Sequence, residues 1–77
     1  MIIAKYAHPE NGTEYDHRFA DSLLSVGAEY NVSSIIVGQS YTSIFLFDYT
    51  VQFNSVLFDF YEDGHPVDIY QYGTRWF

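Results

Sequence analysis

Only one segment of this chain has the periodicity of an amphipathic helix, and almost all of the other apolar residues follow strand patterns. Phe19, Leu23, Val26 and Tyr30 recur at helical spacing. The rest of the chain is rich in β-branched and aromatic residues, which favour strands. Because one helix can cover only one face of a sheet, the fold has to bury the other face by another means or leave it exposed.

The helical segment has a clear start and a less sharply marked end. The run Thr13-Glu14-Tyr15-Asp16 resembles a capping box, with an acidic residue three positions after a threonine. We therefore predict a helix that begins at Glu14 or His17, ends at Ala28 or Tyr30, and has Asn31 as its C-cap.

Five segments outside the helix have the composition of strands, and turn signals separate them. The expected strands are Met1–Ala7, Val32–Val37, Thr42–Tyr49, Val51–Tyr61 and Val67–Tyr72. The expected turns contain Asn11-Gly12, Gly38-Gln39-Ser40 and the hairpin pair Asp63-Gly64. The order β-α-β-β-β-β predicts a single α+β domain over residues 1–77, with an antiparallel sheet of about four to five strands and one helix packed on one face.

The alternation of side chains along these strands predicts an uncovered aromatic face. Leu57, Tyr61, Tyr70 and Tyr72 fall on the face opposite the helix, together with part of Thr42–Tyr49. A large apolar patch seldom stays exposed without a role. Two interpretations remain open. Either the sheet curls over these rings or the Trp76-Phe77 tail folds back on them, or the face is an interface with a second copy or another protein.

The composition excludes several classes of protein. There are 3 Lys+Arg against 10 Asp+Glu, a net charge of −7, so direct binding to nucleic acid is not expected. The chain has no Cys, which excludes disulfides and thiolate sites. No apolar run is long enough for a signal peptide or a membrane span, so we expect a cytoplasmic protein that does not bind membranes.

No pattern in the chain predicts catalysis or a cofactor. A group of acidic residues with one histidine surrounds the predicted hairpin, and such a group could hold a divalent ion: Asp59, Glu62, Asp63, His65 and Asp68. Solvated turn residues are the more common explanation, and no H-E-x-x-H, EF-hand or G-x-S-x-G motif is present. We therefore expect neither an enzyme, nor a metal site, nor a cofactor.

The acidic residues of the last two predicted strands suggest instead a surface that binds a protein. Carboxylates at i and i+2 of a strand lie roughly 6–7 Å apart, similar to the spacing of phosphates along a nucleic acid. Tyrosine is enriched at the anchor positions of interfaces. The candidate partner-binding residues are Asp59, Tyr61, Glu62, Asp63, Asp68, Tyr70 and Tyr72.

In size, acidity, lack of Cys and lack of a catalytic motif, the chain resembles the small acidic inhibitors that bacteriophages and mobile elements encode against host defence nucleases, including anti-CRISPR proteins. The resemblance implies a non-enzymatic DNA mimic that blocks a basic nucleic-acid-binding protein, such as a CRISPR effector or another nuclease, in the host cytoplasm. The alternative is a small structural protein that forms homodimers or larger assemblies through its aromatic sheet face.

Overall fold

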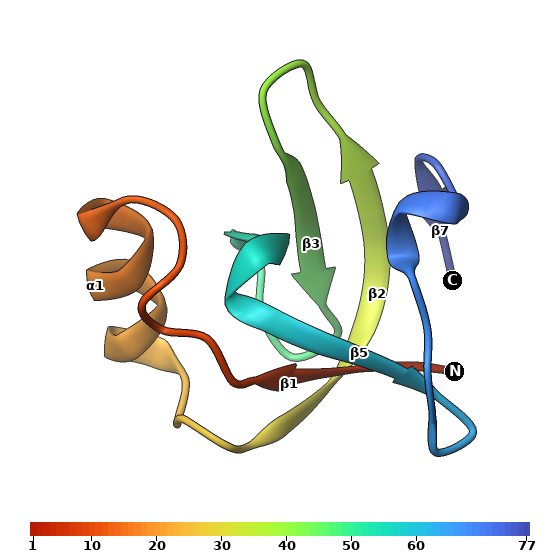
Figure 1. The fold of residues 1–77 in the computed structure, drawn as a ribbon, viewed down its shortest axis with the longest axis horizontal. Coiled ribbons are helices and arrows are strands. Elements are labelled where there is room, and N and C mark those ends of the chain that lie inside the picture. The colour runs from red at the N-terminus through yellow and green to blue at the C-terminus, as the bar shows by residue number, and fades with distance from the viewer.

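The computed structural model describes all 77 residues, which form one α-helix, two short 3-10 helices and a seven-stranded sheet (Figure 1). The helices are α1 (Glu14–Leu23), η1 (Ser55–Leu57) and η2 (Ile69–Gln71). The strands are β1 (Ile2–Tyr6), β2 (Glu29–Val37), β3 (Thr42–Leu46), β4 (Gln52–Asn54), β5 (Phe58–Glu62), β6 (His65–Pro66) and β7 (Arg75–Trp76). Every strand pair is antiparallel, so the predicted α+β class is confirmed, with more and shorter strands than expected.

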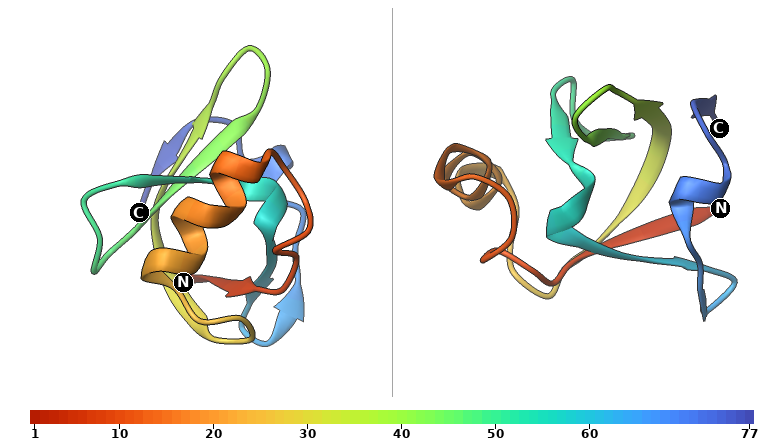
Figure 2. Two further views of the ribbon diagram at one scale, coloured as in Figure 1. Left: turned by 90° about the vertical axis from the view of Figure 1, so that its left-hand side faces the viewer. Right: turned by 45° about the horizontal axis from the view of Figure 1, so that its top comes forward.

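The long strand β2 joins two halves of the sheet. The strand order is β4-β3-β2-β1-β5-β6, and β7 also pairs with β2. The first residues of β2 pair with β1, whereas Val32–Val37 pair with β3. A register shift between Val32 and Ser34 marks an irregularity of the kind that bends a strand. The views in Figure 2 show β2 curving from one half of the sheet toward the other.

Helix α1 begins as predicted but ends earlier. The Thr13 hydroxyl accepts a hydrogen bond from the Asp16 backbone N–H, and the Asp16 carboxylate accepts one from the Thr13 N–H, each at 3.1 Å. The prediction that the helix continues to Ala28 or Tyr30 is wrong, because it ends at Leu23. Gly27, with φ of +87°, donates its N–H to the Tyr6 carbonyl at 2.7 Å. The chain is therefore already pairing beside β1, and the predicted C-cap Asn31 lies within β2.

The predicted strand Val51–Tyr61 is also wrong, since η1 divides it into β4 and β5. The Asn54 side chain accepts a hydrogen bond from the Val56 N–H at 3.2 Å, which starts the 3-10 turn. The turn carries the chain from the edge beside β3 to the edge beside β1. Because the alternation is broken there, Leu57 is buried instead of lying on an uncovered face with Tyr61.

The segment beyond the hairpin differs from the prediction as well. Asp63, with φ of +52°, and Gly64, with φ of +80°, form the tight turn between β5 and β6, so the hairpin is confirmed. The predicted strand Val67–Tyr72 is wrong, because β6 ends at Pro66 and the chain turns into η2. This turn buries Ile69.

The core lies between the two halves of the sheet and extends under the helix. Fourteen hydrophobic residues are buried: Ile2, Ala4, Tyr6, Ala20, Leu24, Val32, Ile35, Ile44, Leu46, Phe53, Leu57, Phe58, Phe60 and Ile69. From within the helix only Ala20 is fully buried, with Phe19 packed against the core. Most of the hydrophobic stabilisation therefore comes from strand residues facing one another.

The C-terminal tail folds back onto β2 and, in part, onto the predicted tyrosines, since the Phe77 and Tyr72 ring centres lie 6.3 Å apart. Strand β7 pairs with β2 at Ser34 and Ile35, and the Phe77 N–H donates to the Ser33 carbonyl at 2.9 Å. The tail thus covers part of the edge of β2 that β1 leaves free. Trp76 itself stays 71% exposed.

Candidate binding surfaces

Three of the predicted partner-binding residues lie together around one hollow. Asp59, Asp68 and Tyr70 line a cavity of about 390 Å³. The cavity is bounded by β5, by the two 3-10 helices and by the loop that carries His8. We call it the η2 hollow. The sequence placed these residues on one face of the sheet, in the two predicted strands Val51–Tyr61 and Val67–Tyr72, whereas the structure brings them together from a strand and a helical turn.

The polar groups of the η2 hollow are bound to one another. Asp59 contacts the His8 Nε2 at 2.7 Å, and this hydrogen bond raises the pKa of His8 although partial burial of the ring opposes the shift. Asp68 accepts a hydrogen bond from the Tyr70 backbone N–H at 3.0 Å and so caps η2. The Tyr70 hydroxyl lies 3.0 Å from the Ser55 hydroxyl. These side chains therefore contribute to the fold.

The other four predicted residues do not line this hollow. The Tyr72 hydroxyl donates to Glu62 at 3.0 Å, and that bond raises the pKa of Tyr72. Asp63 is exposed at the hairpin turn. Tyr61 is half-buried on β5, opposite Ile3 of β1. The predicted site is consequently divided between the hollow and the β5–β6 hairpin.

The acidic residues around the hairpin do not converge. Asp59 is bound to His8, Glu62 to Tyr72, and Asp68 to the backbone of η2. No group of three His, Asp or Glu side chains has the arrangement of a metal site. The residues considered for a divalent ion therefore contact different partners and do not gather around a common point.

Sequence reasoning missed a second cavity, which lies between α1 and the β3–β4 hairpin. This aromatic cleft has a volume of about 450 Å³ and includes the rings of Tyr15, Phe19, Tyr41 and Phe45 among its lining residues. Tyr15 and Phe19 stack, with ring centres 6.0 Å apart and planes inclined by 9°. The i, i+4 spacing of these two rings was a usable signal, since it places them on one face of a helix.

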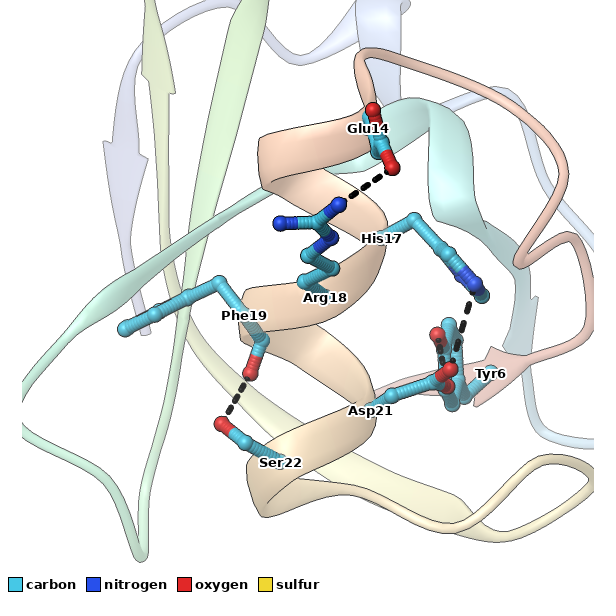
Figure 3. A network of polar contacts seen from close by, with 7 residues as sticks. All are labelled: Tyr6, Glu14, His17, Arg18, Phe19, Asp21 and Ser22. Carbon is cyan, nitrogen blue, oxygen red and sulfur yellow. Dashed lines mark hydrogen bonds and ion pairs between the residues drawn. The ribbon is translucent and has the colours of Figure 1, made fainter.

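A polar network fastens α1 to β1 on the side of the helix away from Phe19 (Figure 3). Asp21 accepts a hydrogen bond from the buried Tyr6 hydroxyl at 2.6 Å and lies 3.3 Å from the His17 Nε2 (Figure 3). Burial and the neighbouring carboxylate raise the pKa of Tyr6 far above its ordinary value. The phenol therefore stays protonated and acts as a hydrogen-bond donor that links β1 to the helix.

A third surface consists of exposed rings on the half of the sheet formed by β2, β3 and β7. Phe47, Trp76 and Phe77 are 52%, 71% and 40% exposed, and all three line a shallow groove of about 430 Å³. This exposed aromatic surface replaces the one predicted from Leu57, Tyr61, Tyr70 and Tyr72. The guanidinium of Arg75 lies over the Tyr72 and Phe77 rings, 5.5 and 5.2 Å from their centres.

The negative charge of the molecule is almost uncompensated by internal ion pairs. Among ten carboxylates, only Glu14 forms an ion pair with a lysine or arginine, Arg18 of the next helical turn (Figure 3). Glu29, Asp48 and Asp63 form no side-chain hydrogen bond or ion pair within the chain. Three acidic groups are therefore available to an external partner.

A comparison with models of protein families shows to which family the chain belongs. The model of the family described as Bacteriophage T4 protein Y07B matches residues 1–75. The chain belongs to this phage protein family. No curated protein and no solved structure matches it. The phage origin expected from the resemblance is thus supported, whereas an action against host defence is not tested by the match.

None of the helices of this phage protein is a candidate for a membrane span. Helix α1 has ten residues, and no helix is long and apolar enough to cross a bilayer.

Proposed function

We propose that this phage protein is a non-enzymatic inhibitor that binds a basic surface of a host protein, with a nucleic-acid-binding defence protein such as a CRISPR effector or another nuclease as the partner class. The observation that carries the proposal is the uncompensated charge of −7, with a single Lys or Arg ion pair in the whole chain. Such a field accelerates the encounter with a positively charged protein and repels nucleic acid.

The structure changes the roles that we assign to the acidic residues. Asp59 and Asp68 hold His8 and η2 in place, so their substitution would disturb the fold as well as the charge. Glu29, Asp48 and Asp63 have no such internal contact and are exposed. We assign electrostatic steering to these three carboxylates. The rings of Tyr61, Tyr70 and Tyr72 remain candidates for buried anchor contacts.

A charge-neutralised variant tests the proposal. Glu29→Gln, Asp48→Asn and Asp63→Asn together change the net charge from −7 to −4 and break no internal hydrogen bond. The wild-type protein, used as bait in a host lysate at low salt, should retain basic nucleic-acid-binding proteins that are eluted by salt. With the purified partner, the variant should associate on the order of 10-fold more slowly at low ionic strength, and the difference should shrink as salt is added.

The matched control replaces the one Lys or Arg ion pair. Glu14→Gln with Arg18→Gln changes the surface but leaves the charge at −7, so its association rate should equal that of wild type. A partner that binds both variants and wild type at the same rate, at low and high salt, would show that charge does not guide the interaction. Inhibition of the partner's nucleic-acid binding is the activity to be measured.

A second candidate function, a homo-oligomeric assembly protein, is favoured by the exposed rings of Phe47, Trp76 and Phe77. If these rings meet in a dimer, sedimentation at micromolar concentration should give a mass twice that of the chain. Trp76→Ala should restore the monomer, and high salt should tighten the wild-type dimer because it screens the repulsion between two negative copies. A monomer across this concentration range would exclude this candidate.

A further inference from the structure

The aromatic cleft between α1 and the β3–β4 hairpin contains rings that the fold does not use. The hydroxyl groups of Tyr6, Tyr30, Tyr49, Tyr70 and Tyr72 all form hydrogen bonds within the chain. Those of Tyr15, Tyr41 and Tyr61 form none. Tyr61 is half-buried on β5, whereas Tyr15 and Tyr41 line the cleft and are 73% and 52% exposed. Clustered exposed rings of this kind mark binding surfaces.

The cleft nevertheless has a rigid base. Phe19 packs against the buried Phe53, with ring centres 5.7 Å apart. The Asn54 side chain donates a hydrogen bond to the Asp16 carboxylate at 3.1 Å and so ties β4 to the first turn of α1. The two walls are therefore joined, and a ligand entering the cleft would meet a preformed surface.

Asp16 gives the cleft its charge. It is the only charged residue among those lining the cleft, which include no Lys, Arg or His. Its Oδ2 accepts hydrogen bonds from Thr13 and Asn54, while Oδ1 forms none. Partial burial tends to raise the pKa of Asp16, but these hydrogen bonds lower it further than burial raises it, so the carboxylate is ionised at neutral pH.

Flat rings beside one carboxylate form a surface complementary to a guanidinium group. Arginine stacks its planar cation on aromatic rings and donates hydrogen bonds to a carboxylate in the same approach. Lysine has a compact and more strongly hydrated charge that gains less from ring faces. A purely apolar side chain would leave the Asp16 Oδ1 without a partner, and an anionic ligand would be repelled.

We propose that the aromatic cleft binds an arginine side chain presented by the basic partner protein. This inference rests on the proposed function, because it names the group through which the basic partner would be held. Steering by the free carboxylates brings the partner close, and insertion of one arginine between Tyr15, Tyr41 and Asp16 then selects the docking position.

The test uses the full 77-residue chain and three small probes. Acetyl-Gly-Arg-Gly-amide, the corresponding lysine peptide and the citrulline peptide are titrated into ¹⁵N-labelled protein at physiological salt. The arginine peptide should shift the amide signals of residues that line the cleft, with Tyr41 and Gln52 among them. It should bind roughly 3-fold more tightly than the lysine peptide, and roughly 10-fold more tightly than citrulline, which lacks the charge.

Substitutions distinguish the cleft from the rest of the acidic surface. Tyr41→Ala should lower the affinity for the arginine peptide roughly 3-fold. Tyr41→Phe should retain the wild-type affinity, because the hydroxyl is not needed for stacking. Val26→Ala is the control, since Val26 is 62% exposed and does not line the cleft. It should leave peptide binding unchanged.

Three outcomes would overturn the inference. These are shifts centred on the η2 hollow or on Trp76, equal binding of arginine and lysine peptides at dispersed acidic residues, or no saturable shift. The two proposals fail separately. A cleft that binds the arginine peptide while the lysate yields no basic partner would support arginine recognition by the cleft and overturn the proposed function. A basic partner that binds Tyr41→Ala and wild type equally well would support the proposed function and overturn the inference about the cleft.

Discussion

The η2 hollow and the aromatic cleft are cavities of similar size that differ in how their side chains are used. Their volumes are about 390 and 450 Å³. Around the hollow, Asp59, Asp68 and Tyr70 are engaged by His8, a backbone N–H and Ser55. Around the cleft, the Asp16 Oδ2 is engaged by Thr13 and Asn54, whereas the Asp16 Oδ1 and the hydroxyls of Tyr15 and Tyr41 have no partner within the chain. Helix α1, one wall of the cleft, and η2, one wall of the hollow, lie at opposite ends of the molecule in Figure 1, although the consecutive residues Asn54 and Ser55 line the cleft and the hollow respectively.

The comparison shows why residue type alone is a weak guide to a binding site. Acidic residues and tyrosines occur at both places, but those of the hollow stabilise a 3-10 turn and a loop. A side chain that already satisfies another group gains less from an external partner, because the internal bond has to be replaced. Side chains without an internal role are therefore the better candidates for recognition.

The largest expected difference between the two regions is in stability. Ile69 is 1% exposed and anchors η2 beneath the hollow, so Ile69→Ala should lower the free energy of unfolding by about 2–5 kcal/mol. Tyr41→Ala at the cleft should change it by no more than about 0.5 kcal/mol. Urea unfolding followed by circular dichroism measures both. Equal losses at the two positions would mean that the cleft is as much part of the fold as the hollow.

A smaller effect should follow from the cap of η2. Asp68→Ala removes the acceptor of the Tyr70 N–H and should cost about 1 kcal/mol of unfolding free energy. Asp68→Asn keeps an acceptor oxygen and should recover most of this loss while removing the charge. Chemical denaturation of both variants separates the two roles. If Asn destabilises as much as Ala, the charge of Asp68 matters to the fold and the cap does not.

The smallest effect concerns the pH dependence of the His8–Asp59 contact. The folded-state pKa of His8 is raised, so the contact stabilises the fold fully below the unfolded pKa of about 6.5. This contribution is lost as the pH rises through the higher folded-state value. Because His8 is partly exposed, the contact should contribute only about 0.2–1 kcal/mol to the free energy of unfolding.

Urea unfolding at pH 5.5 and pH 8.5, compared with His8→Gln, measures that contribution. The variant should lose this pH-dependent stabilisation. The His8 imidazole signals of the wild type should titrate above the ordinary histidine range. A His8 that titrates at its ordinary value would show that Asp59 is free of this contact in solution. Asp59 would then join Glu29, Asp48 and Asp63 as a group available to a partner.

The sequence by itself determined the parts of the fold that depend on near neighbours. The capping box at Thr13 and Asp16 starts α1, because its two hydrogen bonds connect residues three positions apart. The Asp63-Gly64 pair makes the hairpin, because two residues adopt positive φ there. The α+β class follows from one helical segment among strands. Each of these features depends on residues close in the chain.

The candidate site could be predicted only in part. Asp59, Asp68 and Tyr70 do come together, yet the reasoning that joined them assumed continuous strands through Val51–Tyr61 and Val67–Tyr72. The 3-10 turns η1 and η2 interrupt both segments and change which side chains face inward. The aromatic cleft requires α1 to lie beside β3 and β4, a placement that no local pattern encodes.

The tertiary structure alone decided where the helix ends, how the strands are ordered and which rings remain exposed. The helical period continues past Leu23 in the sequence, but pairing of Glu29 with Lys5 and of Tyr30 with Ala4 takes those residues into β2. Strand β7 pairs with β2 at Ser34 and Ile35, beyond the residues Glu29–Asn31 that pair with β1. In each case backbone hydrogen bonds between distant segments, together with burial of the core that they enclose, outweigh the weak preferences of the local sequence.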